Sequence, residues 1–173
     1  MKILVFVKAT PKSERGIMPN DQELARLLTE MGQFNEKLIA AGVMQEADGL
    51  KPSSFGKRIK FSDTGATTVV DGPFAETKEL VAGYWVWNVK SVDEAVEWAK
   101  QCPNPMPGEE GVIEIRPTNS IEDFESALTD EHRARDQRLR KELARQQRKA
   151  KSKRVPTRKK AARRKPARAR AKK

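Results

Sequence analysis

The stretch between residues 69 and 87, VVDGPFAETKELVAGYWVW, holds the side chains best suited to proton transfer. A carboxyl group whose pKa is raised by burial can act as a general acid or base near neutral pH, so Asp71 and Glu76 are the candidate catalytic residues. Gly72 permits unusual backbone angles and Pro73 fixes φ, which makes this turn rigid. The same turn would equally suit a plain corner, with Asp71 accepting hydrogen bonds from backbone amides and Glu76 on a solvated helical turn.

Three further side chains are candidates for holding a substrate. Lys8 follows an apolar run and Arg116 lies near the end of a later one, so both can reach the mouth of a cleft and bind a carboxylate or phosphate. Either residue could equally be an ordinary surface cation. Tyr84 completes the predicted substrate-binding set. The segment AGYWVW loosely resembles an RNA-stacking strand, but it lacks the basic residue that this motif needs before its glycine.

The sequence lacks the residues that several other kinds of site require. The sequence has one cysteine, Cys102, and one histidine, His132, so it offers neither a zinc cluster nor a Cys-His or Ser-His nucleophile in the first 130 residues. It has no glycine-rich phosphate loop. We therefore predict no metal site and no cofactor. A single cysteine also excludes an intrachain disulfide, and no apolar run is long enough for a membrane span, so we expect a cytoplasmic protein without membrane contacts.

The elements that must position these residues follow from hydrophobic periodicity. Residues 2–8 predict a strand buried on both faces, and residues 20–41 predict a helix of about six turns, with Asn20 and Glu23 as a capping pair and Gly42 as its stop. A second capping box, Ser91 with Glu94, begins a helix that ends before Pro103. Further strands are predicted at 43–50, 57–63 with 66–72 as a hairpin, 82–89 and 111–117.

This order predicts an α+β fold of ferredoxin-like topology, with an antiparallel sheet and two helices on one face. The other sheet face then has no helix to cover it. Aromatic residues of the 82–89 strand would be exposed there, which favours a homodimer that packs sheet against sheet.

The motifs DGPFAETKE, GYW, SVDEAVEWAKQCPNP, EIRP and EDF occur in an order and spacing that resemble the YCII-related family, in its Asp-Gly-Pro-Phe branch, over residues 1–125. The resemblance implies a dimeric α/β barrel related to small-molecule enzymes, but no settled reaction for this branch. Some members of the wider family use a His and Asp pair, whereas the one histidine here, His132, lies outside the matching region.

Charge divides the chain into two parts. Residues 1–130 hold 14 basic and 21 acidic residues, a net charge of −7, whereas residues 131–173 hold 21 and 3, a net charge of +18. The predicted organisation is a YCII-related domain over 1–128, a charged helical extension over 129–150 and a disordered basic tail over 151–173. Such a tail neutralises phosphates without reading bases. The predicted nucleic-acid-binding residues are Lys159, Lys160, Arg163, Arg164, Lys165, Arg168 and Arg170.

Two functions remain compatible with these features, and whether the protein is an enzyme stays open. The first is a dimeric domain that binds an unknown small molecule, or acts on it by acid–base chemistry, and carries a tail for non-specific DNA or RNA binding. The second is a non-enzymatic DNA- or RNA-associated protein whose domain only dimerises the tail and so raises its avidity. In the second case the protein would be associated with the nucleoid.

Overall fold

The structure is a computed structural model, and it describes residues 1–75 and 79–154. The chain forms two compact units, Met1–Thr118 and a second unit that begins at Asn119. Each unit is described by itself.

The first unit is built on a four-stranded antiparallel sheet with the order β2-β5-β1-β6. Its strands are β1 (Lys2–Lys8), β2 (Met44–Gly49), β5 (Val81–Asn88) and β6 (Ile113–Pro117). Helix α2 (Asp21–Ala40) connects β1 to β2, and helix α3 (Val92–Ala99) connects β5 to β6. The α+β class with an antiparallel sheet is therefore confirmed, and the element order is the β-α-β-β-α-β arrangement.

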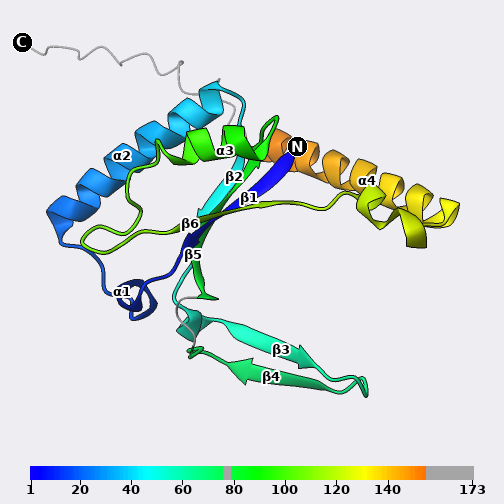
Figure 1. Ribbon diagram of the computed structural model, residues 1–173, viewed down its shortest axis with the longest axis horizontal. Coiled ribbons are helices and arrows are strands. Elements are labelled where there is room, and N and C mark those ends of the chain that lie inside the picture. Colours follow the sequence, from blue (N-terminus) through cyan, green and yellow to red (C-terminus); the bar gives the residue numbers. More distant parts are fainter. Residues whose placement is uncertain (76–78, 155–173) are drawn as a thin grey trace, which may run out of the picture. The chain divides into compact units, whose positions relative to one another are not determined.

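Both helices cover the same face of the sheet (Figure 1). The register places Val5 between Trp85 on β5 and Ile115 on β6, so alternate residues of the three strands point toward the helices. The core consists of these residues and the helix residues that pack on them: Ile3, Val5, Val7, Phe34, Leu38, Val43, Trp85, Trp87, Val89 and Ala95.

Helix α2 begins and ends where the sequence predicts. The side chain of Asn20 accepts a hydrogen bond from the amide of Glu23 at 2.9 Å, and Gly42 follows the helix with a positive φ of 71°. That φ value favours glycine, because a side chain there would meet the backbone. Phe34 and Leu38 are the buried residues of α2, while Leu28 on its outer face is 64% exposed.

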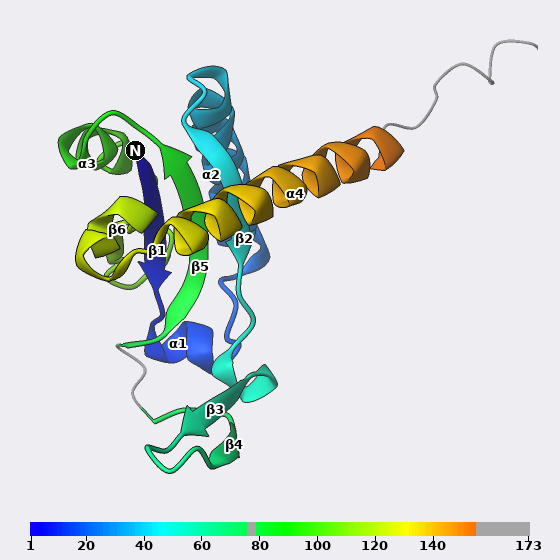
Figure 2. The same ribbon diagram turned by 90° about the vertical axis from the view of Figure 1, so that its right-hand side faces the viewer.

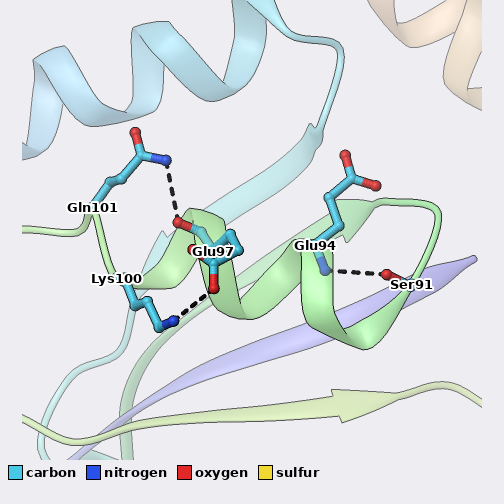
Figure 3. A network of polar contacts seen from close by, with 5 residues as sticks. All are labelled: Ser91, Glu94, Glu97, Lys100 and Gln101. Carbon is cyan, nitrogen blue, oxygen red and sulfur yellow. Dashed lines mark hydrogen bonds and ion pairs between the residues drawn. The ribbon is translucent and has the colours of Figure 1, made fainter.

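Helix α3 begins at the predicted cap. The hydroxyl of Ser91 accepts a hydrogen bond from the Glu94 amide at 3.1 Å (Figure 3). Near its end Lys100 pairs with Glu97 at 2.6 Å, and the helix stops at Ala99, before the predicted terminator. This short helix contributes the buried Ala95 to the core.

The second face of the sheet carries the other alternate residues. Leu4 and Phe6 of β1 and Tyr84 and Val86 of β5 are half-buried there. The prediction that both faces of the first strand are buried is wrong for the single chain, because the two helices of this unit cover one face. We call the face that bears Leu4, Phe6, Tyr84 and Val86 the open face.

The predicted hairpin forms a separate two-stranded sheet, β3 (Lys57–Phe61) with β4 (Thr67–Asp71). In both views it extends beyond the end of the four-stranded sheet (Figures 1 and 2). Its side chains are exposed on both faces, apart from the half-buried Val70. The sequence analysis missed two short turns at the base of this region, α1 (Pro11–Glu14) and η1 (Ser53–Phe55).

The second unit contains the 3-10 segment η3 (Ile121–Ala127) and the helix α4 (Asp130–Arg154). The side chains of α4 are described up to residue 149, and most of them are charged. No helix in the described part of the chain is both long and apolar enough to cross a membrane.

Candidate functional site

A pocket lies between α2 and the sheet because the side chains of β5 that face the helices become smaller toward the N-terminal end of the strand. The residues of β5 that face the helices are Trp87, Trp85 and then Gly83, and the neighbouring strand β2 offers Ala47 and Gly49 at the same end. Gly83 lies close to β2. A Cβ at this position would be 3.1 Å from the backbone oxygen of Asp48, which favours glycine there. The two tryptophans fill one end of the interface and leave space at the other.

This space has two adjoining parts, named here by their place along the sheet: the inner part lies beside Trp85 and the outer part beside α1. The inner part has a volume of about 280 Å³ and is lined by Met31 and Asn35 of α2, Ala47, Gly83, Trp85 and Met106. The outer part has a volume of about 470 Å³ and shares Ala82, Pro105 and Met106 with the inner one. Volumes of this order, with mainly apolar walls, are typical of sites for small organic molecules.

The outer part contains an oriented carboxylate. Thr10, which is 8% exposed, donates its hydroxyl hydrogen to Oε2 of Glu109 at 2.7 Å and accepts a hydrogen bond from the Ser13 amide at 3.2 Å. Both Thr10 and Glu109 line the pocket, together with the cation of Lys12. The threonine fixes one carboxylate oxygen, so the other can accept a hydrogen bond or a proton from a bound molecule.

The inner part contains one polar side chain from α2. Asn35 accepts a hydrogen bond from the indole Nε1 of Trp85 at 2.9 Å, and this contact joins the helix to the sheet. The amide nitrogen of Asn35 then remains as a donor beside the pocket that it lines. The arrangement gives a largely apolar cavity with a donor, Asn35, in its inner part and an acceptor, Glu109, in its outer part.

The structure places the three predicted substrate-binding residues on the open face. The Nζ of Lys8 lies 3.3 Å from Oε2 of Glu114, and Arg116 lies 3.6 Å from Oε1 of the same carboxylate. Tyr84 donates its hydroxyl hydrogen to Glu46 at 2.7 Å, and this hydrogen bond raises the pKa of the phenol. The register brings the three close together on the sheet face opposite the helices, and Tyr84 also borders the inner part of the pocket.

Asp71 is the last residue of β4, and its side chain is 74% exposed. It forms an ion pair with Lys57 directly across the hairpin. The partner seen for Asp71 is thus a side-chain cation on the neighbouring strand. The other predicted catalytic residue, Glu76, lies outside the described residues.

The turn that follows Asp71 packs its backbone against η1. The Gly72–Pro73 peptide is cis, and the amides of Gly72 and Phe74 donate to Gly56 O at 3.1 Å and Ser53 Oγ at 3.2 Å. The guanidinium of Arg58 lies 4.0 Å above the ring of Phe74, a cation–π contact. These contacts close the base of the hairpin against η1.

The described residues contain no group of three or more His, Cys, Asp or Glu side chains placed to hold a metal ion. The seven predicted nucleic-acid-binding residues, Lys159 to Arg170, lie outside the described part of the chain.

Comparison with known proteins agrees with this architecture. The model of the YCII-related domain matches residues 1–122. The chain belongs to the YCII-related family. An uncharacterized protein of Rhizobium meliloti (strain 1021) is 33% identical over 96 residues, which is 56% of this chain and 76% of that protein. The resemblance found in the sequence is thereby confirmed for the family, and neither comparison assigns a reaction to the YCII-related domain.

Of the residues that line the pocket of the YCII-related domain, the sequence analysis selected Tyr84 and missed the others discussed above. Thr10 and Glu109 are 99 positions apart, and no local pattern connects them. One signal was available: Gly83, Trp85 and Trp87 occupy alternate positions of one predicted strand, so a small residue replaces a large one on a single face. Asn35 also lies four positions after Met31 and three before the buried Leu38, which places it on the side of α2 that faces the sheet.

Proposed function

We propose that the YCII-related domain binds a small, mainly apolar molecule in the pocket between α2 and the sheet. The observation that supports it most directly is the Thr10–Glu109 hydrogen bond, in which a buried hydroxyl orients a carboxylate in the wall of a mainly apolar cavity. A ligand with an N–H or O–H group, or a cationic nitrogen, suits that carboxylate. Two glutamates, Glu23 and Glu109, line this part of the pocket, and we assign the role of proton acceptor to Glu109 because Thr10 orients it.

Binding of the fluorescent apolar amine N-phenyl-1-naphthylamine tests this proposal. Met31→Trp fills the inner part of the pocket and should weaken binding at least about 10-fold, because the apolar contact area of the probe is lost. Glu109→Gln should weaken it by about 10-fold or more, the value of a hydrogen bond to a charged group. The matched control, Leu28→Trp, makes the same kind of change on the outer face of α2 and should leave binding unchanged.

Equal binding by Met31→Trp and Leu28→Trp would remove the pocket as the site. Denaturation of each variant, followed by tryptophan fluorescence, would show that a loss of binding is not a loss of folding.

A second arrangement within the same domain uses the residues that the sequence selects. We propose Lys8, Arg116 and Tyr84 as ligand-holding groups on the open face, with Asp71 and Glu76 as acid–base residues. The supporting observation is that Lys8 donates a hydrogen bond to the backbone oxygen of Glu79 at 3.4 Å, which brings the segment after the Asp-Gly-Pro-Phe turn to this face.

Asp71→Asn and Glu109→Gln distinguish the two arrangements, because each removes one carboxylate charge with little change in shape. Loss of probe binding in the Glu109 variant alone favours the pocket. Loss in the Asp71 variant alone favours the open face. Thermal unfolding of both variants provides the control for stability.

We also propose that the domain forms a homodimer through the open face. Leu4, Phe6 and Val86 form an apolar strip there, which pairing with a second copy would remove from water. Phe6→Asp should then convert a dimer to a monomer in size-exclusion chromatography with light scattering. A wild-type protein that elutes as a monomer at micromolar concentration would contradict the proposal.

The charge of the C-terminal segment supports a second activity, non-specific binding of DNA or RNA. Residues 143–173 hold 16 basic residues and no acidic one. About eight phosphate contacts would give a log–log salt slope near −7 on duplex DNA. Replacing Lys159, Lys160, Arg163, Arg164, Lys165, Arg168 and Arg170 by glutamine should flatten that slope, and an unchanged slope would refute the assignment. If the pocket variants leave probe binding intact while this variant abolishes nucleic-acid binding, the non-enzymatic alternative is favoured.

A further inference from the structure

We propose that α4 itself carries a phosphate-binding surface, formed by Arg138, Lys141, Arg145 and Arg148 and called here the α4 basic face. The inference rests on the proposed nucleic-acid binding of the C-terminal segment. It extends that binding to a helix upstream of the residues that the sequence analysis selected. The partner is the phosphodiester backbone of DNA or RNA.

The spacing of these four residues places them in one row. Successive steps of three, four and three residues keep side chains on the same side of a helix. Arg138 and Arg148 are ten positions apart, so the row is about 15 Å long. It lies on a continuous helix (Figure 2). Ala134, one turn before Arg138, is small and leaves the start of the row accessible. A shallow groove runs beside the row and is lined by Ala134, Gln137, Arg138, Lys141, Glu142 and Arg145.

Two of the four carboxylates of α4 pair with arginines outside this row. Glu131 pairs with Arg135 at 3.1 Å, and Asp136 pairs with Arg140 at 2.6 Å. Asp136 is half-buried, whereas every member of the α4 basic face is exposed. Arg135 and Arg140 are also exposed, so the two sets of cations on this helix differ in carboxylate pairing.

A further carboxylate of the second unit, Glu122, interacts with arginines of α4 that lie outside the α4 basic face. The pKa of Glu122 in η3 is lowered, first by hydrogen bonds from its own backbone and from Ser120, and then by the charges of Arg133 and Arg140. Arg133 is half-buried and is not part of the α4 basic face. Glu122 therefore adds to the neutralisation of the other cations and leaves the row unaffected.

Within the α4 basic face, Arg145 lies 3.9 Å from Glu142. Arg138, Lys141 and Arg148 have no ion-pair partner among the side chains described in residues 1–75 and 79–149. Exposed guanidinium groups without a carboxylate partner can bind phosphate oxygens through two parallel hydrogen bonds. The row therefore presents uncompensated positive charge in a fixed arrangement.

A nucleic-acid backbone fits this row in charge and length. Duplex DNA carries one negative charge per about 1.7 Å of axis, so 15 Å offers about nine phosphates to four cations. The segment 130–149 contains no Phe, Tyr or Trp that could stack on bases, so the contacts would be to the backbone. The helix continues to Arg154, so its last residues belong to the basic segment 143–173.

The test uses the full-length protein with two double variants of equal net charge. Arg138→Gln/Lys141→Gln removes two cations from the α4 basic face, and the control Arg135→Gln/Arg140→Gln removes two that are already paired. Fluorescence anisotropy between 50 and 200 mM salt measures binding to a 20-base-pair DNA duplex and to a 20-nucleotide RNA strand. The face variant should flatten the salt slope on the duplex by about 2 and weaken binding by about 60-fold at 0.1 M salt, whereas the control should change affinity less than about 3-fold.

Equal losses in the two double variants would overturn the inference, because net charge alone would then explain them. Glutamine is a good helix former, and far-UV circular dichroism checks that α4 persists. A second pair in the row, Arg145→Gln/Arg148→Gln, repeats the measurement independently. The DNA and RNA arms identify which polymer the face prefers, and a loss on either one supports the inference.

The variant with seven glutamines between residues 159 and 170 separates this inference from the proposed function. If that variant loses affinity and the face variant does not, the α4 basic face is excluded and the proposed function stands. If only the face variant loses affinity, the assignment to residues 159–170 fails and the face remains. If the wild-type protein binds neither polymer, both are refuted.

Discussion

Replacing Gly72 by alanine should detach the β3–β4 hairpin from the rest of the YCII-related domain. A Cβ at this position would lie 1.9 Å from the backbone oxygen of Ser53 and 2.6 Å from its carbonyl carbon. Both are backbone atoms, so no side-chain rotation relieves the clash. Either η1 or the turn that contains Gly72 must move.

The movement breaks the contacts that hold the hairpin. The hydrogen bonds from Gly72 to Gly56 and from Phe74 to Ser53 contribute about 1 kcal/mol each. Steric strain of this kind costs about 1–3 kcal/mol. The total of about 3–5 kcal/mol corresponds to at least about a 100-fold increase in the population of the detached hairpin. Because both hairpin faces are exposed, little other packing opposes the opening.

Amide hydrogen exchange, measured by mass spectrometry on peptides from β3 and β4, reports this opening. We expect protection there to fall at least about 100-fold in Gly72→Ala, while unfolding followed by the buried Trp85 and Trp87 changes by less than about 1 kcal/mol. Gly49→Ala is the matched control, since a Cβ at Gly49 meets nothing within 4 Å. Unchanged exchange in β3 and β4 would refute the docking role of the turn. An equal loss in the core would show that hairpin and core unfold together.

Three other perturbations probe the core and the pocket wall. Asn35→Leu leaves the indole N–H of Trp85 without its acceptor and should lower the free energy of unfolding by about 1–3 kcal/mol in urea titration. Leu38→Ala removes a fully buried side chain and should cost about 2–5 kcal/mol, whereas Leu28→Ala on the exposed face should cost less than about 0.5 kcal/mol; similar losses would contradict the packing described. Burial raises the pKa of Cys102 to about 12, so iodoacetamide at pH 8 should modify it far more slowly in the folded protein than in urea.

The α+β fold could be predicted because its determinants are local. The apolar run of β1, the spacing of α2 and the caps at Asn20 and Ser91 each define an element from neighbouring residues. Strand order then follows from few choices, because short connections and the two helices restrict how four strands can pair. Burial of Leu4 and Phe6 was overestimated, since an apolar strand does not say how many layers cover it.

The site was harder to predict because it depends on contacts between distant segments. Glu109 becomes a pocket residue through Thr10, which is 99 positions away, and the pocket itself exists because Gly83 precedes two tryptophans on the same face of β5. Asp71 was selected for its residue type and its rigid turn. Whether such a turn lines a cleft or belongs to an exposed hairpin depends on what its backbone packs against, here Ser53, and sequence alone does not give that contact.

The two proposed binding activities belong to different units, and this separation can be measured. The contacts of Met31 and Glu109 are made within Met1–Thr118, and those of Arg138 and Lys141 within the unit that begins at Asn119. Changes that share no partner add in free energy to within about 0.5 kcal/mol. Combining Met31→Trp with Arg138→Gln/Lys141→Gln should therefore weaken DNA binding no more than the second change does alone. A larger loss would mean that occupancy or shape of the pocket influences the basic helix, a coupling that by reciprocity would also make DNA alter the affinity for the naphthylamine probe.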